Sequence, residues 1–164
     1  MTGPRGNALL DLWLALAAGR LLLRRPDDPG LQRLTAPHLA TDTPQHLAEA
    51  IARGADTLFS ALEAGPDAEP LARMASGCRL SGFDLDLLAL AVLPCFDEDA
   101  AGTIATLTGG TRRVPVGLAL KLLFGDLADP LAVRSALRAS PLWHTGLIRP
   151  DEARRPLLER RLDP

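Results

Sequence analysis

Apolar residues recur at helical spacing along most of this chain. The pattern is strongest between Ser81 and Pro94, where Phe83, Leu87 and Leu90 fall at i, i+4 and i+7 and leucine, alanine and valine fill most other positions. A helix that is apolar nearly all round is usually buried. We therefore expect a buried helix that Ser81 caps and that Pro94 ends, because proline has no amide hydrogen to donate.

Two shorter helices are predicted directly after this one. Asp97 is a suitable cap for a helix over 100–107, and the glycine pair at 109–110 breaks the chain. Pro115 suits the first turn of a third helix over 116–123. Three short helices with tight breaks form a trihelical unit, which is the scaffold of helix-turn-helix and winged-helix modules.

The first half of the chain also reads as helical. Apolar periodicity predicts helices at about 6–25, 44–64 and 67–75. The second of these follows a threonine and a proline at 43–44, which is the order of a cap and a first helical residue. The stretch 26–43 is rich in proline and aspartate and reads as a loop that can hold short helical turns.

The last part of the chain changes character. A helix is expected from Asp129 through Arg138, and the segments 142–148 and 157–162 both look extended. A polar, proline-flanked tip separates them, and its arginines are Arg149, Arg154 and Arg155. A two-stranded ribbon after a trihelical unit is a wing.

These patterns predict a mainly α fold. A helical N-terminal subdomain over 1–79 would be followed by a winged-helix-like trihelical unit with a C-terminal β-hairpin over 80–164. We expect the two subdomains to form one compact unit, since 164 residues suffice for a single domain with a real core.

Composition and charge narrow the class of protein. Hydrophobic residues make up 47% of the chain and charged residues 23%, which indicates a globular protein. A net charge of −2 argues against a bulk binder of nucleic acid or of a membrane surface. Two cysteines without a pattern favour a reduced, cytoplasmic setting. The apolar run 9–23 is interrupted by Asp11, so an amphipathic helix is a better interpretation than a secretory signal.

The sequence contains no recognisable catalytic or cofactor motif. It has no phosphate-binding loop, no short spacing of histidine and cysteine ligands for a metal ion, and no nucleophile elbow. We therefore expect no catalytic, cofactor-binding or metal-binding residue in this segment.

Arg112 and Arg113 are the most informative charged residues. They precede a helix N-terminus, where a cation is disfavoured by about 0.3 to 1 kcal/mol. They can contact a partner, either nucleic acid or protein. The interpretation that we weigh more heavily is that they pair with the acids at 97–99 on the chain's own surface or are simply solvated.

The stretch Leu80–Phe124 resembles a known family. It reads LSGFDLDLLALAVLPCFDED, then TRR and VGLALKLLF, and these motifs are similar to the N-terminal region of bacterial AAA+ ATPases found with extracellular contractile injection systems. The tail segments at 140–142 and 156–164 resemble the part that leads into the ATPase module. Cys95 and Phe96 stand where family members usually carry an acidic residue and leucine.

The resemblance implies a non-catalytic interaction or adaptor domain. Its partners would be its own ATPase module, hexameric in the full-length chain, and a protein of the injection system. ATP and Mg²⁺ would be held by that module, beyond Pro164, and no membrane would be involved.

A DNA-binding winged helix is the alternative. It is suggested by Arg112 and Arg113 together with the arginines of the wing tip. A recognition helix offers polar and basic side chains to base edges, and 116–123 offers little besides Lys121.

Overall fold

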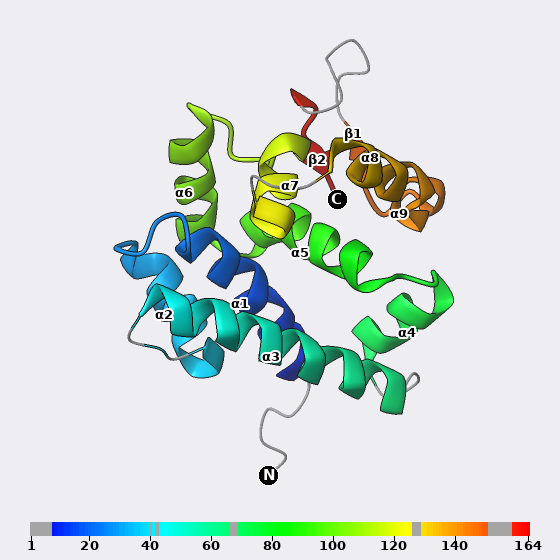
Figure 1. Ribbon diagram of the computed structural model, residues 1–164, viewed down its shortest axis with the longest axis horizontal. Coiled ribbons are helices and arrows are strands. Elements are labelled where there is room, and N and C mark those ends of the chain that lie inside the picture. Colours follow the sequence, from blue (N-terminus) through cyan, green and yellow to red (C-terminus); the bar gives the residue numbers. More distant parts are fainter. Residues whose placement is uncertain (1–7, 40, 42, 66–68, 126–128, 151–158) are drawn as a thin grey trace. The chain divides into compact units, whose positions relative to one another are not determined.

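The computed structural model describes residues 8–39, 41, 43–65, 69–125, 129–150 and 159–164 (Figure 1). These residues are mainly helical, which confirms the predicted fold class. The chain divides into two compact units, Met1–Gly82 and Phe83–Pro164. No helix in the described ranges is both long enough and apolar enough to cross a bilayer.

The first unit is built from α1 (Ala8–Leu22), α2 (Pro29–Leu39), α3 (Pro44–Ala64) and α4 (Pro70–Gly77). Helix α1 packs against both α2 and α3, and α4 contacts α3 (Figure 1). Leucines dominate the buried apolar side chains of these helices, which include Trp13, Leu16, Leu21, Leu31, Leu39, Leu47, Ile51 and Leu58.

Helix α2 corrects the prediction of a loop over 26–43. The carboxylate of Asp28 accepts hydrogen bonds from the amides of Gly30 (3.0 Å) and Leu31 (3.1 Å), and Pro29 takes the first helical position. Aspartate followed by proline is therefore a helix start here, as threonine and proline are at the start of α3. Burial of Leu31 then holds the helix against its neighbours.

Two glycines allow a close approach between helices of this unit. A Cβ atom at Gly54 of α3 would lie 2.8 Å from Cδ2 of Leu16, and one at Gly19 of α1 would lie 2.8 Å from Cδ1 of Leu39. Both leucines are buried. Gly54 lowers the helix propensity of α3, but because it has no side chain it also allows α3 to pack closely on α1.

The second unit contains the rest of the elements. These are α5 (Gly82–Phe96), α6 (Glu98–Thr108), α7 (Val116–Phe124), α8 (Pro130–Ala139), α9 (Pro141–Thr145), β1 (Arg149–Pro150) and β2 (Leu162–Asp163). Helix α5 is buried along most of its length, as its composition predicts. It continues to Phe96 rather than ending at Pro94, because a proline in the last turn removes only one hydrogen bond.

A buried hydrogen bond joins two distant parts of this unit. The hydroxyl of Ser140 donates to the carboxylate of Asp84 over 2.6 Å, and both residues are buried. The same hydroxyl accepts from the amide of Leu142 at the start of α9. The first turn of α5 is thereby tied to the junction of α8 and α9.

The helix breaks around α6 follow the prediction. The carboxylate of Asp97 accepts from the amide of Ala100 over 2.8 Å, so it caps α6. Gly109 and Gly110 end the helix with φ angles of 72° and 120°, which lie in the region that favours glycine.

The predicted extended segment 142–148 is wrong over its first part. Pro141–Thr145 forms the short helix α9, because Ser140 supplies a cap and proline the first position. Gly146, with φ of 73°, ends this helix before the chain enters β1.

A small antiparallel ribbon follows. β1 pairs with β2, with Arg149 opposite Asp163 and Pro150 opposite Leu162. This pairing lies where a wing was predicted, although residues 151–158 between the strands, which include Arg154, Arg155 and the start of the predicted strand at 157, lie outside the described residues.

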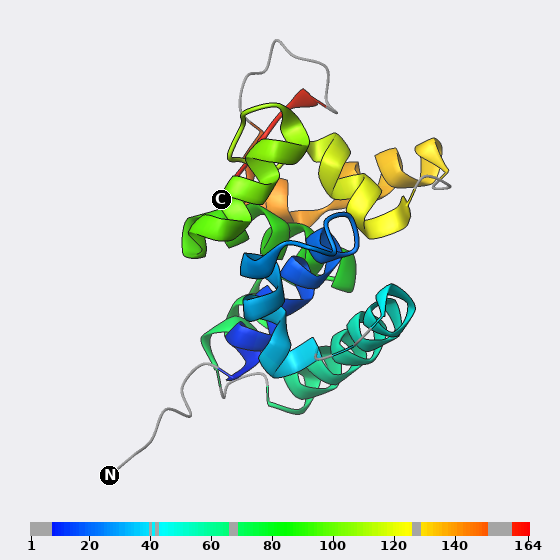
Figure 2. The same cartoon turned by 90° about the vertical axis from the view of Figure 1, so that its left-hand side faces the viewer.

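A third extended segment joins the ribbon and was not predicted. The amide of Leu162 donates to the carbonyl of Val114 over 2.9 Å, and the amide of Val116 donates to the carbonyl of Arg160 over 2.8 Å. Residues 114–116 therefore lie alongside β2, the red strand in Figures 1 and 2, on the side away from β1.

Candidate interaction site

Arg112 and Arg113 lie between the glycine break after α6 and the segment that pairs with β2. Arg112 forms an ion pair with Glu98 at the start of α6. Arg113 forms an ion pair with Asp163 of β2, with 3.0 Å between the guanidinium and the carboxylate. Both arginines are exposed. The expected pairing with the acids at 97–99 is therefore found for Arg112, whereas Arg113 pairs with an acid of β2 instead.

Arg149 lies near the same acid. It stands opposite Asp163 in the register of the ribbon, and its guanidinium lies near Gly146, 3.8 Å from where a Cβ atom would stand. The fold therefore brings two arginines to Asp163: Arg113 forms an ion pair with it, and Arg149 is its partner in the register of the ribbon. Arg154 and Arg155 belong to the undescribed tip, so the structure does not place them.

A surface depression of about 760 Å³ runs beside these arginines. It is lined by the glycine break, by Arg112 and Arg113 and by residues that directly precede α7 and β2: Thr108, Gly109, Gly110, Thr111, Arg112, Arg113, Pro115, Glu159 and Arg161. Its charges are mixed in sign. Glu159, Arg161 and Asp163 were not predicted as members of the site, because only the pairing of residues 114–116 with the tail brings them there.

The pairing of residues 114–116 with the tail places this extended segment before α7, and this changes which helix corresponds to the recognition helix of a helix-turn-helix module. The order along the chain is the extended segment 114–116, then α7, α8, α9 and the ribbon. In a helix-turn-helix arrangement the second helix of the pair is the one presented to DNA. That helix is α8 here, and not the 116–123 helix considered in the sequence.

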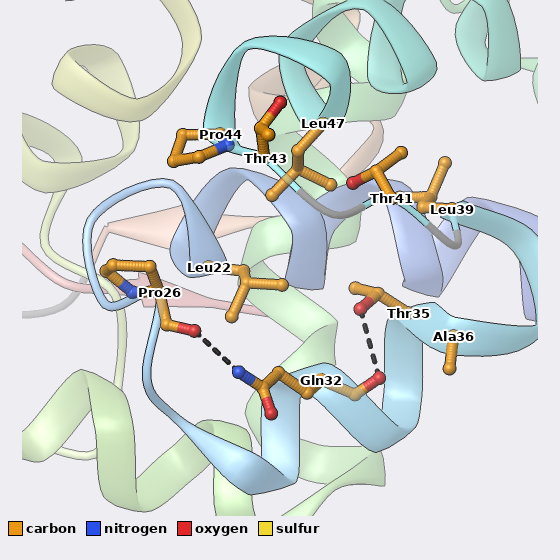
Figure 3. A pocket seen from close by; sticks show the side chains of 10 residues that line it. All are labelled: Leu22, Pro26, Gln32, Thr35, Ala36, Leu39, Thr41, Thr43, Pro44 and Leu47. Carbon is orange, nitrogen blue, oxygen red and sulfur yellow. Dashed lines mark hydrogen bonds between the residues drawn. The ribbon is translucent and has the colours of Figure 1, made fainter.

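A second cavity lies in the first unit, and none of the described residues that line it is charged (Figure 3). It measures about 390 Å³ and lies among α1, α2 and the start of α3. The polar side chains of Gln32 and Thr35 both donate to backbone carbonyls, over 2.7 Å to Pro26 and 2.9 Å to Leu31. These described lining residues therefore offer no titratable group for acid–base chemistry.

Ligand-type side chains are scattered in the part of the chain that the structure describes. No group of three histidine, cysteine, aspartate or glutamate side chains gathers there in a way that could hold a metal ion. Cys78 and Cys95 are both free thiols.

Comparison with known families gives one match. A family model described as a winged helix domain, variant, matches residues 9–164, which is nearly the whole chain. No curated protein and no solved structure matches the chain.

Proposed function

The chain belongs to the winged helix domain, variant, family, and we propose that it acts as a non-catalytic adaptor domain of an AAA+ ATPase linked to a contractile injection system. Winged helix domains are generic interaction or DNA-binding modules, and they are typically non-catalytic. The resemblance of Leu80–Phe124 to the N-terminal region of such ATPases supports the finer assignment. In this role the domain recruits a partner or substrate protein to the ATPase.

The mixed charge of the candidate site favours a protein partner over nucleic acid. Arg112 and Arg113 are each paired with an acid, and Glu159 lies in the same depression. A nucleic-acid site draws most of its affinity from cations that neutralise phosphates, so acids among those cations weaken it. Polar rims of mixed sign are usual in protein interfaces, where they set register and partner choice.

The recognition position supports the same choice. Leu131, near the start of α8, is 76% exposed. Residues at the start of a recognition helix contact base edges through hydrogen bonds, and a leucine side chain has no donor or acceptor to offer. Arg134 and Arg138 of the same helix are exposed basic side chains, so DNA binding is kept as the alternative; we rank it below protein binding because the arginines of the candidate site are paired with acids.

The ATP and Mg²⁺ of this system are assigned to the ATPase module and to no residue of this chain. The partners are that module, in a hexamer, and a protein of the injection system. The cytoplasm is the compartment in which such an ATPase would work.

Binding measurements with matched arginine variants test this proposal. The tagged chain should bind either purified injection particles or the separately produced ATPase module. Arg112→Ala/Arg113→Ala should weaken that binding about tenfold, since arginines are frequent hot spots of interfaces. Arg53→Ala is the control, because Arg53 is an exposed arginine that is also paired with an acid, Glu49, but lies in the first unit.

Two results would remove the proposal. One is that neither the particles nor the ATPase module binds the chain. The other is that the chain binds duplex DNA with an affinity that falls steeply with salt and is lost in the Arg112→Ala/Arg113→Ala variant, which would establish the DNA-binding alternative.

A further inference from the structure

Helix α8, labelled in Figure 1, carries two exposed arginines and an exposed leucine on one face. These three residues, Leu131, Arg134 and Arg138, are named the α8 stripe. We propose that the α8 stripe binds an acidic amphipathic helix of a partner protein. This binding goes beyond the adaptor role and does not depend on it, because a synthetic peptide can reproduce it without the ATPase module or the injection particles.

The α8 stripe follows from helical spacing. Its members fall at i, i+3 and i+7, so they share one side of the helix. The other side packs into the core of the second unit through Val133 and Leu137, which are both buried. The stripe is therefore the part of α8 that remains open to a binding partner.

Arg134 and Arg138 have no partner within the described part of the chain. Neither guanidinium forms an ion pair or a hydrogen bond with a described residue, whereas Arg112 and Arg113 are each paired with an acid. The helix dipole favours Arg138 in the last turn of α8, but Arg134 lies in the middle of the helix, four residues from a like charge. Helix stability therefore does not account for Arg134, and acids from outside the chain would compensate both charges.

Leu131 gives the α8 stripe an apolar end. With 76% exposure it is the most exposed of the large apolar side chains that the structure describes. The carboxylate of the neighbouring Asp129 accepts a hydrogen bond from the amide of Leu131 over 3.0 Å and so belongs to the helix cap. A leucine in line with two unpaired cations has the composition of an interface, in which an apolar contact is bordered by charged residues.

The spacing within the stripe defines what the partner must offer. A rise of about 1.5 Å per residue places Arg134 and Arg138 about 6 Å apart along α8, with Leu131 about 4.5 Å before Arg134. The partner therefore presents two carboxylates about 6 Å apart and an apolar side chain next to them. Glutamates at i and i+4 of a helix have this separation, and a leucine three residues away lies on the same face.

A helix fits this surface better than an extended peptide. Extended peptides bind mainly through backbone hydrogen bonds to the edge of a sheet, and α8 offers side chains only. Both outer segments of the ribbon contain a proline, Pro115 and Pro150, which has no amide hydrogen to donate to an added strand. Two helices, in contrast, pack through their side chains at an axial separation of about 8 to 10 Å.

A protein segment also fits better than nucleic acid. Duplex DNA carries a negative charge about every 1.7 Å, and two arginines neutralise only a small part of it. Bases would gain nothing from Leu131, whose side chain has no hydrogen-bond donor or acceptor. An acidic amphipathic helix uses all three members of the stripe, since its own apolar side chain covers Leu131.

Fluorescence anisotropy with a labelled synthetic peptide is the first test. The probe is a helix of about 15 residues built from alanine, leucine and glutamate, with one leucine and two glutamates at i, i+3 and i+7. It should bind the chain with a dissociation constant below about 1 mM, and the same peptide with glutamine in place of glutamate should bind at least about tenfold more weakly.

Two double variants locate the binding site. Arg134→Glu/Arg138→Glu should weaken binding of the glutamate peptide at least about tenfold, because like charges then face each other. Arg25→Glu/Arg53→Glu makes the same change of net charge at two exposed arginines of the first unit and should leave the affinity unchanged. Circular dichroism of each variant confirms that it is folded.

A charge exchange separates direct contact from general attraction. A peptide with lysine at both glutamate positions should not bind the wild-type chain, and it should bind the Arg134→Glu/Arg138→Glu variant. Leu131→Ser removes the apolar contact without changing the charge and should weaken binding of the glutamate peptide about fivefold. Leu23→Ser is its control, since Leu23 is also exposed but lies in the first unit.

Three outcomes would overturn the proposal. The glutamate peptide could fail to bind, or it could bind the Arg134→Glu/Arg138→Glu variant as tightly as the wild type. Duplex DNA could instead bind through Arg134 and Arg138, with an affinity that falls steeply with salt, while the peptide does not bind, which would assign the stripe to nucleic acid. None of these measurements uses the ATPase module or the injection particles, so the stripe and the adaptor role are tested separately.

Discussion

The two units of the chain use the same local signals but differ in what they expose. In the first unit, the described residues include one large exposed apolar side chain, Leu23. The second unit exposes Phe96, Phe124 and Leu131 and adds the ribbon with its flanking arginines. This difference is the reason that we place the proposed contact surface in the second unit.

The local signals that both units share are caps followed by proline. Asp28, Thr43, Asp129 and Ser140 each precede a proline and each accept a hydrogen bond from an amide of the helix that follows. The two units differ in their tertiary packing. Close glycine contacts join α1 and α3 in the first unit, whereas strand pairing joins the start of α7 to the tail in the second.

The largest expected effect tests the glycine packing of the first unit. Gly54→Leu should lower the free energy of unfolding by about 3 kcal/mol, because a side chain there would overlap the buried Leu16. Gly102→Leu is the matched control in the second unit, since Gly102 is exposed on α6 and no atom lies within 4 Å of the added Cβ.

Gly102→Leu should raise stability by about 0.5 kcal/mol through helix propensity. Chemical denaturation measures both variants. Equal effects at the two positions would show that α1 and α3 are not packed as closely as the structure has them.

The buried bond between Asp84 and Ser140 is the corresponding test of the second unit. Asp84→Ala should cost about 2 kcal/mol, because it leaves the buried Ser140 hydroxyl without its charged acceptor. A double-mutant cycle with Ser140→Ala should give a clear coupling energy in denaturation experiments. Additive single effects would contradict a direct bond.

Removal of a helix cap should lower the free energy of unfolding by the same amount in both units. Thr43→Ala removes the cap of α3 and Asp97→Ala removes the cap of α6, and each should lower stability by about 1 kcal/mol. The same denaturation assay measures both. A much larger effect of Asp97→Ala would mean that this residue has a second role in the fold of the second unit.

The smallest effect on stability is expected at the candidate site itself. Arg112→Ala and Arg113→Ala should each change stability by no more than about 0.5 kcal/mol, since both ion pairs are exposed. Arg53→Ala in the first unit should behave alike in thermal unfolding. A large loss of stability in Arg113→Ala alone would make this arginine a structural clamp on the ribbon rather than a contact residue.

The sequence predicts the structure correctly where a feature depends on residues that are neighbours in the chain. The caps of α3 and α6, the glycine break at 109–110 and the buried character of α5 all follow from neighbouring residues. Helix α2 was missed because its apolar positions are few and Pro37 interrupts them, although Asp28 and Pro29 carried the signal.

The candidate site depends on contacts that are distant in the sequence. Alternation of the buried Val114 and Val116 around Pro115 could have suggested a strand before α7. Its partner at 160–162, and hence the ion pair of Arg113 with Asp163, could not be found from spacing alone, because the pairing joins residues that lie far apart along the chain.

The mass and peptide content of the natural protein test the central claim most directly. An antibody against this domain should isolate the protein from its host, and mass spectrometry should then identify its peptides. We predict a chain far heavier than 17.4 kDa that also yields peptides with ATPase motifs. A protein of 17.4 kDa that yields only peptides of this sequence would contradict the proposal that the domain serves as part of an ATPase.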